Sequence, residues 1–235
     1  MGGTVTAGEL VPETFLSYLE PQDHEFLLAR GATRRLPADT VLMHEGDPTN
    51  HVLVLLTGWV RVYRTTPDGQ VVLLALRGPG DVIGDIAALL DWPRTATVDS
   101  MQDTGFVQFR HDEFLACVQE RPALGFALLK QMAVRLRDAD GARVDFATMD
   151  VAQRVALLLV HLADVHGTMT ARGVAVRMPL TQQDIANRVG GSLRAVARAV
   201  AAFRERGLLV TGRREFVLTA PDVLRSFSDN MPNGI

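Results

Sequence analysis

A narrow seam of side chains at helical spacing runs through residues 121–147. Its members recur at alternating steps of four and three residues, and they are Gly125, Leu129, Met132, Leu136, Ala139, Arg143 and Phe146. This is the a/d spacing of a coiled coil, and Pro122 suits the first turn of a helix because its missing N–H is not needed there. About 26 helical residues would reach roughly 40 Å, more than a small domain needs internally. The seam predicts either a helix that pairs with a second copy or a long helix of the core. The sequence on either side of 121–147 distinguishes between these two.

The chain can bury a substantial core. It has 235 residues, of which 47% are hydrophobic, enough for one large or two ordinary domains. Cys117 is the only cysteine, which excludes an internal disulfide and a four-cysteine metal cluster and fits a reducing cytoplasm. The N-terminus lacks a basic flank followed by an apolar core, and the longest apolar run, 52–56, is too short to span a bilayer. We therefore expect a cytoplasmic protein with no required metal and no membrane partner.

Charge is distributed unevenly along the chain. Residues 1–120 hold 8 Arg and no Lys against 17 acidic residues, a net charge of −9, whereas the remainder carries +6. Within 181–214, seven arginines oppose only Asp184 and Glu205. This asymmetry predicts that the second part binds an anion that the first does not, although a solvated basic face would look the same.

The pattern of residues 1–120 changes from helix to strand. Residues 12–30 favour one or two short helices. After them come short β-rich runs, separated at close to ten-residue intervals by Gly, Pro and Asp: 41–44, 51–56, 59–65, 71–76, 94–99 and 105–110. Such even spacing predicts a small antiparallel barrel or jelly roll.

One segment, VIGDIAALLDWPR at 82–94, interrupts this β pattern. Gly84 permits close backbone approach, and 85–90 can form a short helix whose N-terminal amides suit an anion. Arg94 and Thr95 add a cation and a hydroxyl. Singly, these residues could be a turn glycine or a surface ion-pair residue, but together they describe a cradle for a sugar phosphate, with an aspartate able to accept from sugar hydroxyls.

The C-terminal part contains a helix-turn-helix pattern. Thr181 can cap a helix over 182–189 in a capping box with Asp184. A Gly-Gly turn follows, and Ser192 can cap a second helix over 193–206. Two short helices joined so tightly cannot both be buried, so the second is exposed along one edge.

The exposed edge of the second helix is basic. Arg194 and Arg198 share a face and suit the O6 and N7 atoms of guanine, and 208–219 reads as a wing hairpin that turns at Gly212. Other polar and basic residues are better placed for phosphates. The predicted DNA contacts are Thr181, Gln182, Arg188, Ser192, Leu193, Arg194, Arg198, Arg204, Arg213 and Arg214.

Two motifs resemble a known family. GDIAALLDWPRTATV at 84–98 resembles the phosphate-binding cassette of the cyclic-nucleotide-binding domain, and EGDPTNHVLVLLTGWVRVYR at 45–64 resembles that domain's β-roll. With the helix-turn-helix in the expected order, 15–218 resembles the CRP/FNR transcription regulators. In that family the acidic residue takes the ribose 2′-hydroxyl and the Arg-Ser/Thr pair takes the cyclic phosphate. The resemblance implies effector contacts at Gly84, Asp85, Ile86, Ala87, Arg94, Thr95, Ala139 and Asp140.

The sequence departs from the family pattern at both sites. Cyclic-AMP binders usually have Glu where this chain has Asp85, and they read adenine with a Thr-Ser pair where it has Ala139 and Asp140. A buried base edge that loses its partner costs on the order of 1 to 3 kcal/mol. In the recognition helix the family's base readers are Arg, Glu and Arg, and the chain has Leu193, Arg194 and Arg198. The last agrees, so the usual half-site is not expected.

The resemblance settles the role of the seam and implies an α+β protein in three parts. These are a β-roll sensor (1–120), a dimerisation helix (121–147) and a winged helix-turn-helix (148–235). The dimer interface would hold Leu129, Met132, Leu136, Ala139, Arg143 and Phe146. The implied partners are a second copy, a pseudo-palindromic double-stranded operator and RNA polymerase, and the implied effector is a cyclic nucleotide, foremost cyclic AMP.

Two alternatives remain open. The cassette could be vestigial in an effector-independent regulator, or the chain could be a nucleotide-responsive interaction module that no longer binds DNA. An enzyme is not expected, because the sequence contains no readable nucleophile–base pair, metal triad or Walker loop.

Overall fold

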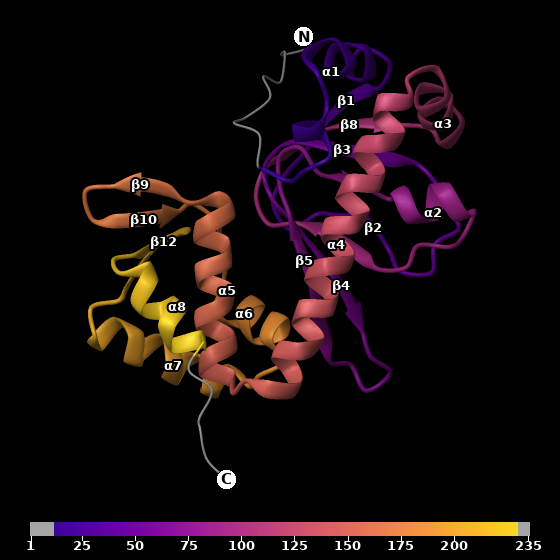
Figure 1. Ribbon diagram of the computed structural model, residues 1–235. Coiled ribbons are helices and arrows are strands. Elements are labelled where there is room, and N and C mark those ends of the chain that lie inside the picture. Colours follow the sequence, from indigo (N-terminus) through magenta and orange to yellow (C-terminus); the bar gives the residue numbers. More distant parts are fainter. Residues whose placement is uncertain (1–11, 230–235) are drawn as a thin grey trace. The chain divides into compact units, whose positions relative to one another are not determined.

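The computed structural model describes residues 12–229, and the chain divides into two compact units, Met1–Arg137 and Asp138–Ile235. The predicted long helix is confirmed as α4, Pro122–Thr148, which begins in the N-terminal unit and ends in the C-terminal unit (Figure 1). None of the helices in 12–229 is long and apolar enough to cross a membrane.

Two antiparallel four-stranded sheets form the N-terminal unit, as the even spacing of β-rich runs predicted. The first sheet has the order β1-β8-β3-β6 and the second the order β2-β7-β4-β5. Their strands are β1 (Ala32–Leu36), β2 (Val41–Met43), β3 (Val52–Thr57), β4 (Val60–Thr65), β5 (Val71–Arg77), β6 (Val82–Ile83), β7 (Thr97–Ser100) and β8 (Thr104–Phe109).

Strand β3 is buried on both faces, which explains its uninterrupted apolar run. Leu53 and Leu55 pack with Val60 and Val98 of the second sheet. The alternate residues of β3 point the other way, into a core shared with the helices. Those helices are the 3-10 helix η1 (Leu16–Tyr18), α1 (Pro21–Leu28), α2 (Asp85–Leu90), α3 (His111–Glu120) and the first turns of α4.

The C-terminal unit combines helices with a third sheet of order β11-β12-β10-β9. Its helices are α5 (Val151–His166), α6 (Gln182–Val189), α7 (Leu193–Glu205) and α8 (Pro221–Asp229), and its strands are β9 (Thr168–Thr170), β10 (Gly173–Val176), β11 (Leu209–Gly212) and β12 (Glu215–Leu218). Helices α6 and α7 are the predicted helix-turn-helix, and β11 and β12 are the predicted wing.

Candidate functional site

The residues predicted to form the cradle lie at the junction of β6 and α2 in the N-terminal unit. Gly84 has a φ of 81°, a left-handed conformation that disfavours any side chain. A Cβ added there would lie 2.5 Å from Nη1 of Arg94 and 2.7 Å from the carbonyl oxygen of His51. Glycine is therefore required both by the backbone conformation and by the arginine that packs against it.

The Arg94 side chain is buried, with 3% of its surface exposed. Each of its three nitrogens donates a hydrogen bond: Nε to Thr49 Oγ1 (3.1 Å), Nη1 to the Gly84 carbonyl (3.2 Å) and Nη2 to the His51 carbonyl (2.7 Å). Burial lowers the pKa of Arg94, while Asp47 and Asp85 act in the opposite direction. The cradle thus holds a fixed, desolvated cation whose direct hydrogen bonds are to neutral oxygens.

Asp85 also has a partner within the protein, and the sequence did not reveal it. Its Oδ2 accepts from Nη1 of Arg135 in α4 at 2.8 Å, and only 4% of the Asp85 side chain is exposed. Nη2 of Arg135 donates to the Val82 carbonyl (2.6 Å) and lies 3.8 Å from Oδ1 of Asp81. Arg135 therefore connects the long helix to the cradle.

The polar connection continues one turn earlier in α4. Gln131, which is buried, donates from Nε2 to Oδ1 of Asp81 at 2.7 Å. The other carboxylate oxygen of Asp81 accepts from the Gly78 backbone at 3.0 Å. Gln131 and Arg135 are four residues apart, so they lie on one face of α4 and fix its rotation against β6.

The other predicted effector residues differ in exposure. Ala87 is buried, whereas Ile86 and Thr95 are exposed. Ala139 and Asp140 belong to the C-terminal unit and are exposed, with Oδ1 of Asp140 lying 3.6 Å from Nη1 of Arg143. The N-terminal unit therefore brings together Gly84, Asp85 and Arg94, with Arg135 as an additional member.

An apolar hollow of about 460 Å³ lies beside α2 and opens onto the seam of α4. It is lined by Ile86, Leu89, Leu90, Met132, Arg135 and Leu136. Two seam residues, Leu129 and Leu136, have 63% and 64% of their surface exposed. Ala139 and Arg143 are exposed and Met132 is half-buried. Exposed leucines at seam spacing are a feature typical of an interaction surface.

The last seam residue, Phe146, makes contacts within its own unit. Its ring packs on Gly190 and lies 5.1 Å, centroid to Cζ, from the guanidinium of Arg154. Nearly half of its surface, 48%, stays exposed.

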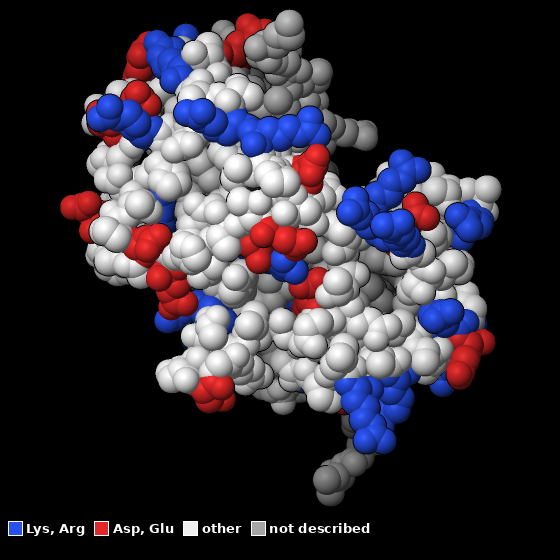
Figure 2. Space-filling model, turned by 180° about the vertical axis from the view of Figure 1, so that it is seen from behind, with Lys and Arg blue, Asp and Glu red and all other residues white. Residues whose placement is uncertain are grey.

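Figure 2 shows groups of Lys and Arg side chains protruding from one face of the molecule. In the C-terminal unit, helix α7 buries Val196, Val200 and Phe203 on one side. On the other side Arg194 and Arg198 are exposed, as predicted. Arg204, near the C-terminal end of the helix, is also exposed, and Leu193 keeps 47% of its surface in solvent.

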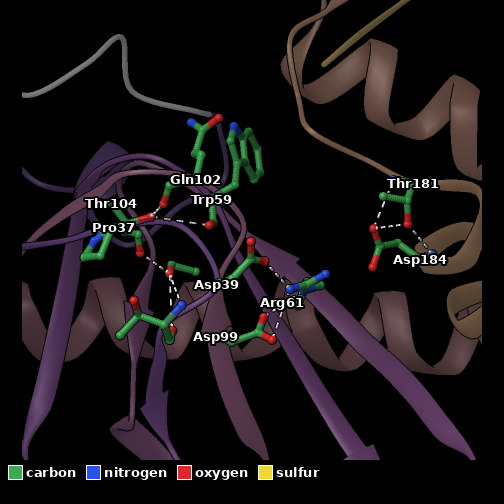
Figure 3. Close-up of polar contacts among 11 residues, drawn as sticks. Pro37, Asp39, Trp59, Arg61, Asp99, Gln102, Thr104, Thr181 and Asp184 are labelled. Atoms are coloured by element: carbon green, nitrogen blue, oxygen red, sulfur yellow. Dashed lines mark hydrogen bonds and ion pairs between the residues drawn. The ribbon is translucent and has the colours of Figure 1, made fainter. Parts of the chain in front are cut away.

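Side-chain caps fix the starts of both helices of the motif. Thr181 and Asp184 form the predicted capping box: Asp184 N–H donates to Thr181 Oγ1 (3.0 Å) and Thr181 N–H to Asp184 Oδ2 (2.9 Å) (Figure 3). Ser192 accepts from the Ala195 N–H at 3.2 Å. Thr181, Gln182 and Ser192 are all exposed. The first turn of each helix is therefore accessible to a phosphate.

The turn of the β11–β12 wing consists of two arginines. Gly212 pairs with Glu215, so Arg213 and Arg214 form the tip between them, and Arg214 has a φ of 60°. Both arginines are exposed, whereas Glu215 is half-buried and lies 3.5 Å from Nε of Arg177.

Arg188 is placed differently from the other predicted DNA contacts. It is half-buried in α6, and burial lowers its pKa while Asp138 and Asp145, both in α4, act in the opposite direction. Burial likewise raises the pKa of Asp145, against the effects of Arg188 and Arg154. Arg188 is thus attracted electrostatically to carboxylates of α4 in its own unit.

Other charged and reactive groups serve the fold. Arg61 joins Asp99 on the neighbouring strand (Nε to Oδ1, 2.7 Å) and Asp39 (Nη2 to Oδ1, 3.3 Å) (Figure 3). The thiol of Cys117 is buried, and burial raises its pKa, which disfavours the reactive thiolate. Within 12–229, no cluster of three or more His, Cys, Asp or Glu side chains could hold a metal ion.

The sequence matches two protein families in succession. Residues 33–121 match the cyclic nucleotide-binding domain, and residues 153–227 match the Crp-like helix-turn-helix domain. The first match holds the cradle and the second holds α6, α7 and the wing.

Individual relatives match most of the chain. The chain is 32% identical over 171 residues to the CRP-like cAMP-activated global transcriptional regulator of Mycobacterium tuberculosis, covering 73% of this chain and 76% of the relative. It is 27% identical to the cyclic AMP receptor protein of Thermus thermophilus, covering 83% and 87%.

Solved structures share the fold. A CooA variant from Carboxydothermus hydrogenoformans aligns with a TM-score of 0.76 at 22% identity, covering 94% of this chain and 98% of that one. The c-di-GMP responsive global regulator CLP of Xanthomonas campestris aligns with a TM-score of 0.73, also at 22% identity, covering 85% and 99%.

Proposed function

The chain belongs to the CRP/FNR family of DNA-binding transcription regulators and is not an enzyme; from this premise we propose that it acts as a homodimer on a pseudo-palindromic operator under the control of a nucleotide-like anion. The sensor would span 1–120, the dimerisation helix 121–147 and the DNA reader 148–235. Ligand would act by preferring one of two arrangements of the dimer.

The observation that carries the DNA-reading proposal is the exposed edge of α7. Arg194 and Arg198 extend from its first two turns, where a helix inserted in the major groove meets base edges. Their guanidinium groups suit guanine, and Leu193 beside them suits the methyl group of thymine. Ser192, Arg204, Arg213 and Arg214 flank this edge and suit phosphates.

Base reading is tested with duplexes selected from a random library by the purified protein. Arg198→Ala should cost about 1 to 3 kcal/mol against the selected duplex and relax the preference at one position of each half-site. Arg204→Ala is the matched control, because loss of a phosphate contact should weaken selected and random duplexes equally. An Arg198→Ala protein that keeps the full sequence preference would refute the assignment.

The exposed seam of α4 supports the homodimer. A second copy would cover Leu129 and Leu136, which are otherwise solvated. A two-fold dimer places two recognition helices on half-sites about 34–36 Å apart, which is why the operator should be pseudo-palindromic.

The buried cation of the cradle supports an anionic effector. Arg94 beside the left-handed Gly84 and the exposed Thr95 suits the phosphate of a cyclic nucleotide. Cyclic AMP is the first candidate because a relative is described as cAMP-activated, and cyclic di-GMP the second because a structural neighbour is described as c-di-GMP responsive.

Effector-independent regulation is the second candidate, favoured by one feature. Asp85 is already paired with Arg135, and all three nitrogens of Arg94 donate within the protein. Calorimetric titration with cyclic AMP, cyclic GMP and cyclic di-GMP separates the two candidates. Binding that disappears in a folded Arg94→Ala variant supports the effector, whereas operator binding without any nucleotide affinity supports the alternative.

A further inference from the structure

The two glycines of the α6–α7 turn pack closely against neighbouring helices, Gly190 against the end of α4 and Gly191 against the start of α5. A Cβ added to Gly190 would lie 2.6 Å from Cε1 of Phe146, and one added to Gly191 would lie 2.8 Å from Cγ1 of Val151. Only Gly190 has a positive φ, 62°. At Gly191 the missing side chain is therefore explained by the close packing of this turn against the start of α5.

Arg154 connects the end of α4 with the end of α6. Its Nε donates to the carbonyl of Val189, the last residue of α6, at 2.8 Å, and its Nη1 donates to the Met149 carbonyl at 2.5 Å. Its guanidinium also lies over the Phe146 ring, with Cζ 5.1 Å from the centroid. One side chain thus contacts the end of α4, the connection after it and the end of α6. We call Phe146, Met149, Arg154 and Val189 the joint.

We propose that Arg154 and Phe146 are positioning residues for DNA reading, because the joint fixes the start of α7 relative to the end of α4. Helix α7 begins at Leu193, three residues beyond Gly190, so any rotation at the joint moves Arg194 and Arg198. Arg188 of α6 is also attracted electrostatically to Asp138 and Asp145 of α4.

The inference rests on the proposed function, since positioning matters only if α4 pairs with a second copy and α7 reads bases. Two half-sites must be met at once, so a small error at each joint displaces the base contacts of both protomers. Phosphate contacts of random DNA tolerate such an error, because they carry no sequence information. The joint should therefore affect selected and random duplexes differently.

The test uses the full-length protein and the duplex recovered from a random library, with a random-sequence duplex of equal length for comparison. Arg154→Ala should weaken binding of the selected duplex about tenfold or more and leave binding of the random duplex within about twofold. The control is Arg172→Ala, which removes the same charge from an exposed position between β9 and β10 and should change the ratio of the two affinities by less than about twofold.

Substitutions of Phe146 provide a second test of the same proposal. Phe146→Ala removes the ring that lies under Arg154, whereas Phe146→Tyr keeps that ring. Tyr should retain affinity for the selected duplex and Ala should lose it. The double variant with Arg154→Ala should lose no more than the worse single variant, because both act through one contact. Sedimentation shows whether the Phe146 variants remain in the oligomeric state of the parent, since Phe146 also lies in the seam.

The outcomes are distinguishable. If the parent protein selects no sequence, the proposed function fails and the joint has nothing to position. If the parent protein selects a duplex and folded Arg154→Ala and Phe146→Ala bind it as well as the parent does, the positioning role is wrong. Equal weakening on selected and random duplexes also overturns it, because that result marks a loss of charge or stability instead.

Discussion

Asp85 and Arg135 form a pair whose disruption should be costly. Arg135→Met leaves the Asp85 carboxylate buried without its counter-charge, so we expect the free energy of unfolding to fall by about 3 kcal/mol in urea denaturation. Adding Asp85→Asn should restore most of the loss, because the buried charge is then removed.

A matched control for that pair lies two residues further along α4. Arg137 pairs with Glu13 at 3.0 Å, but both side chains are largely exposed, at 60% and 48%. Arg137→Met should therefore cost less than about 1 kcal/mol. Equal losses for Arg135→Met and Arg137→Met would mean that Asp85 is not held as a buried charge.

Histidines make the stability of the N-terminal unit depend on pH. Burial and the nearby Arg94 guanidinium lower the pKa of His51 below its ordinary value of 6.5, and burial lowers the pKa of His24. Between pH 7.5 and 5.5 the unfolded chain therefore binds protons that the folded chain does not, and stability should fall as the pH falls. Urea midpoints at the two pH values measure this, and His51→Asn should reduce the difference. A midpoint that rises on acidification would contradict the assignment.

The sequence predicted those residues of the cradle that lie close together in the chain, but not the one that lies far along it. Gly84, Asp85, Arg94 and Thr95 lie within a dozen positions, so the cradle could be predicted from its motif. Arg135 lies 50 positions from Asp85, and only the rotation of α4, fixed by packing, brings them together. The same limit applies to Arg188, whose direction depends on how α6 turns against α4.

The capping residues of the helix-turn-helix predicted where its two helices begin. The capping box at Thr181 predicted α6 with its observed bounds, and Ser192 predicted the start of α7. Helix α3 was missed because it follows β8 with no intervening Gly or Pro, its start being set by a bond from Arg110 N–H to Glu113 at 2.9 Å. Strand β1 was missed because its side chains are mostly exposed and it joins the sheet through its backbone.

Gly141 offers a test of α4 as an element. It lies in the interior of the helix, and a Cβ added there would meet nothing within 4 Å. Gly141→Ala should raise the free energy of unfolding by up to ~1 kcal/mol, because alanine loses less backbone entropy in a helix. Thermal denaturation measures the gain.

Gly190 is a glycine at which alanine should have the opposite effect on stability to that of Gly141→Ala. Its φ is positive and its space is filled by Phe146, so Gly190→Ala should be destabilised. A Gly141→Ala protein that melts below the parent would indicate that another chain packs against this side of α4.

At the scale of the whole molecule, the charge difference between the two parts of the chain matches their proposed partners. In the acidic N-terminal part the arginine of the proposed effector site, Arg94, is buried, whereas the basic C-terminal part exposes several arginines on α7 and the wing. Helix α4 belongs to both units, since it holds Arg135 at the cradle and Phe146 at the joint. Ligand binding and DNA reading can therefore influence one another only to the extent that they favour different states of this helix.

The seam of α4 is the feature on which this arrangement depends, and Leu136 tests it. The side chain is 64% exposed in a single protomer, so Leu136→Glu should barely change the fold of the protomer itself. In a dimer the change would place two carboxylates in an apolar seam, and sedimentation should show a monomer.

The control for that variant is Leu74→Glu, which adds the same charge at an exposed leucine of β5 outside the seam and should stay dimeric. Because a monomer meets only one half-site at a time, Leu136→Glu should also lose most of its affinity for the selected duplex while Leu74→Glu retains it. If Leu136→Glu still sediments as a dimer, the copies pair through a different surface, and the spacing of the half-sites would have to be derived from that surface instead of from α4.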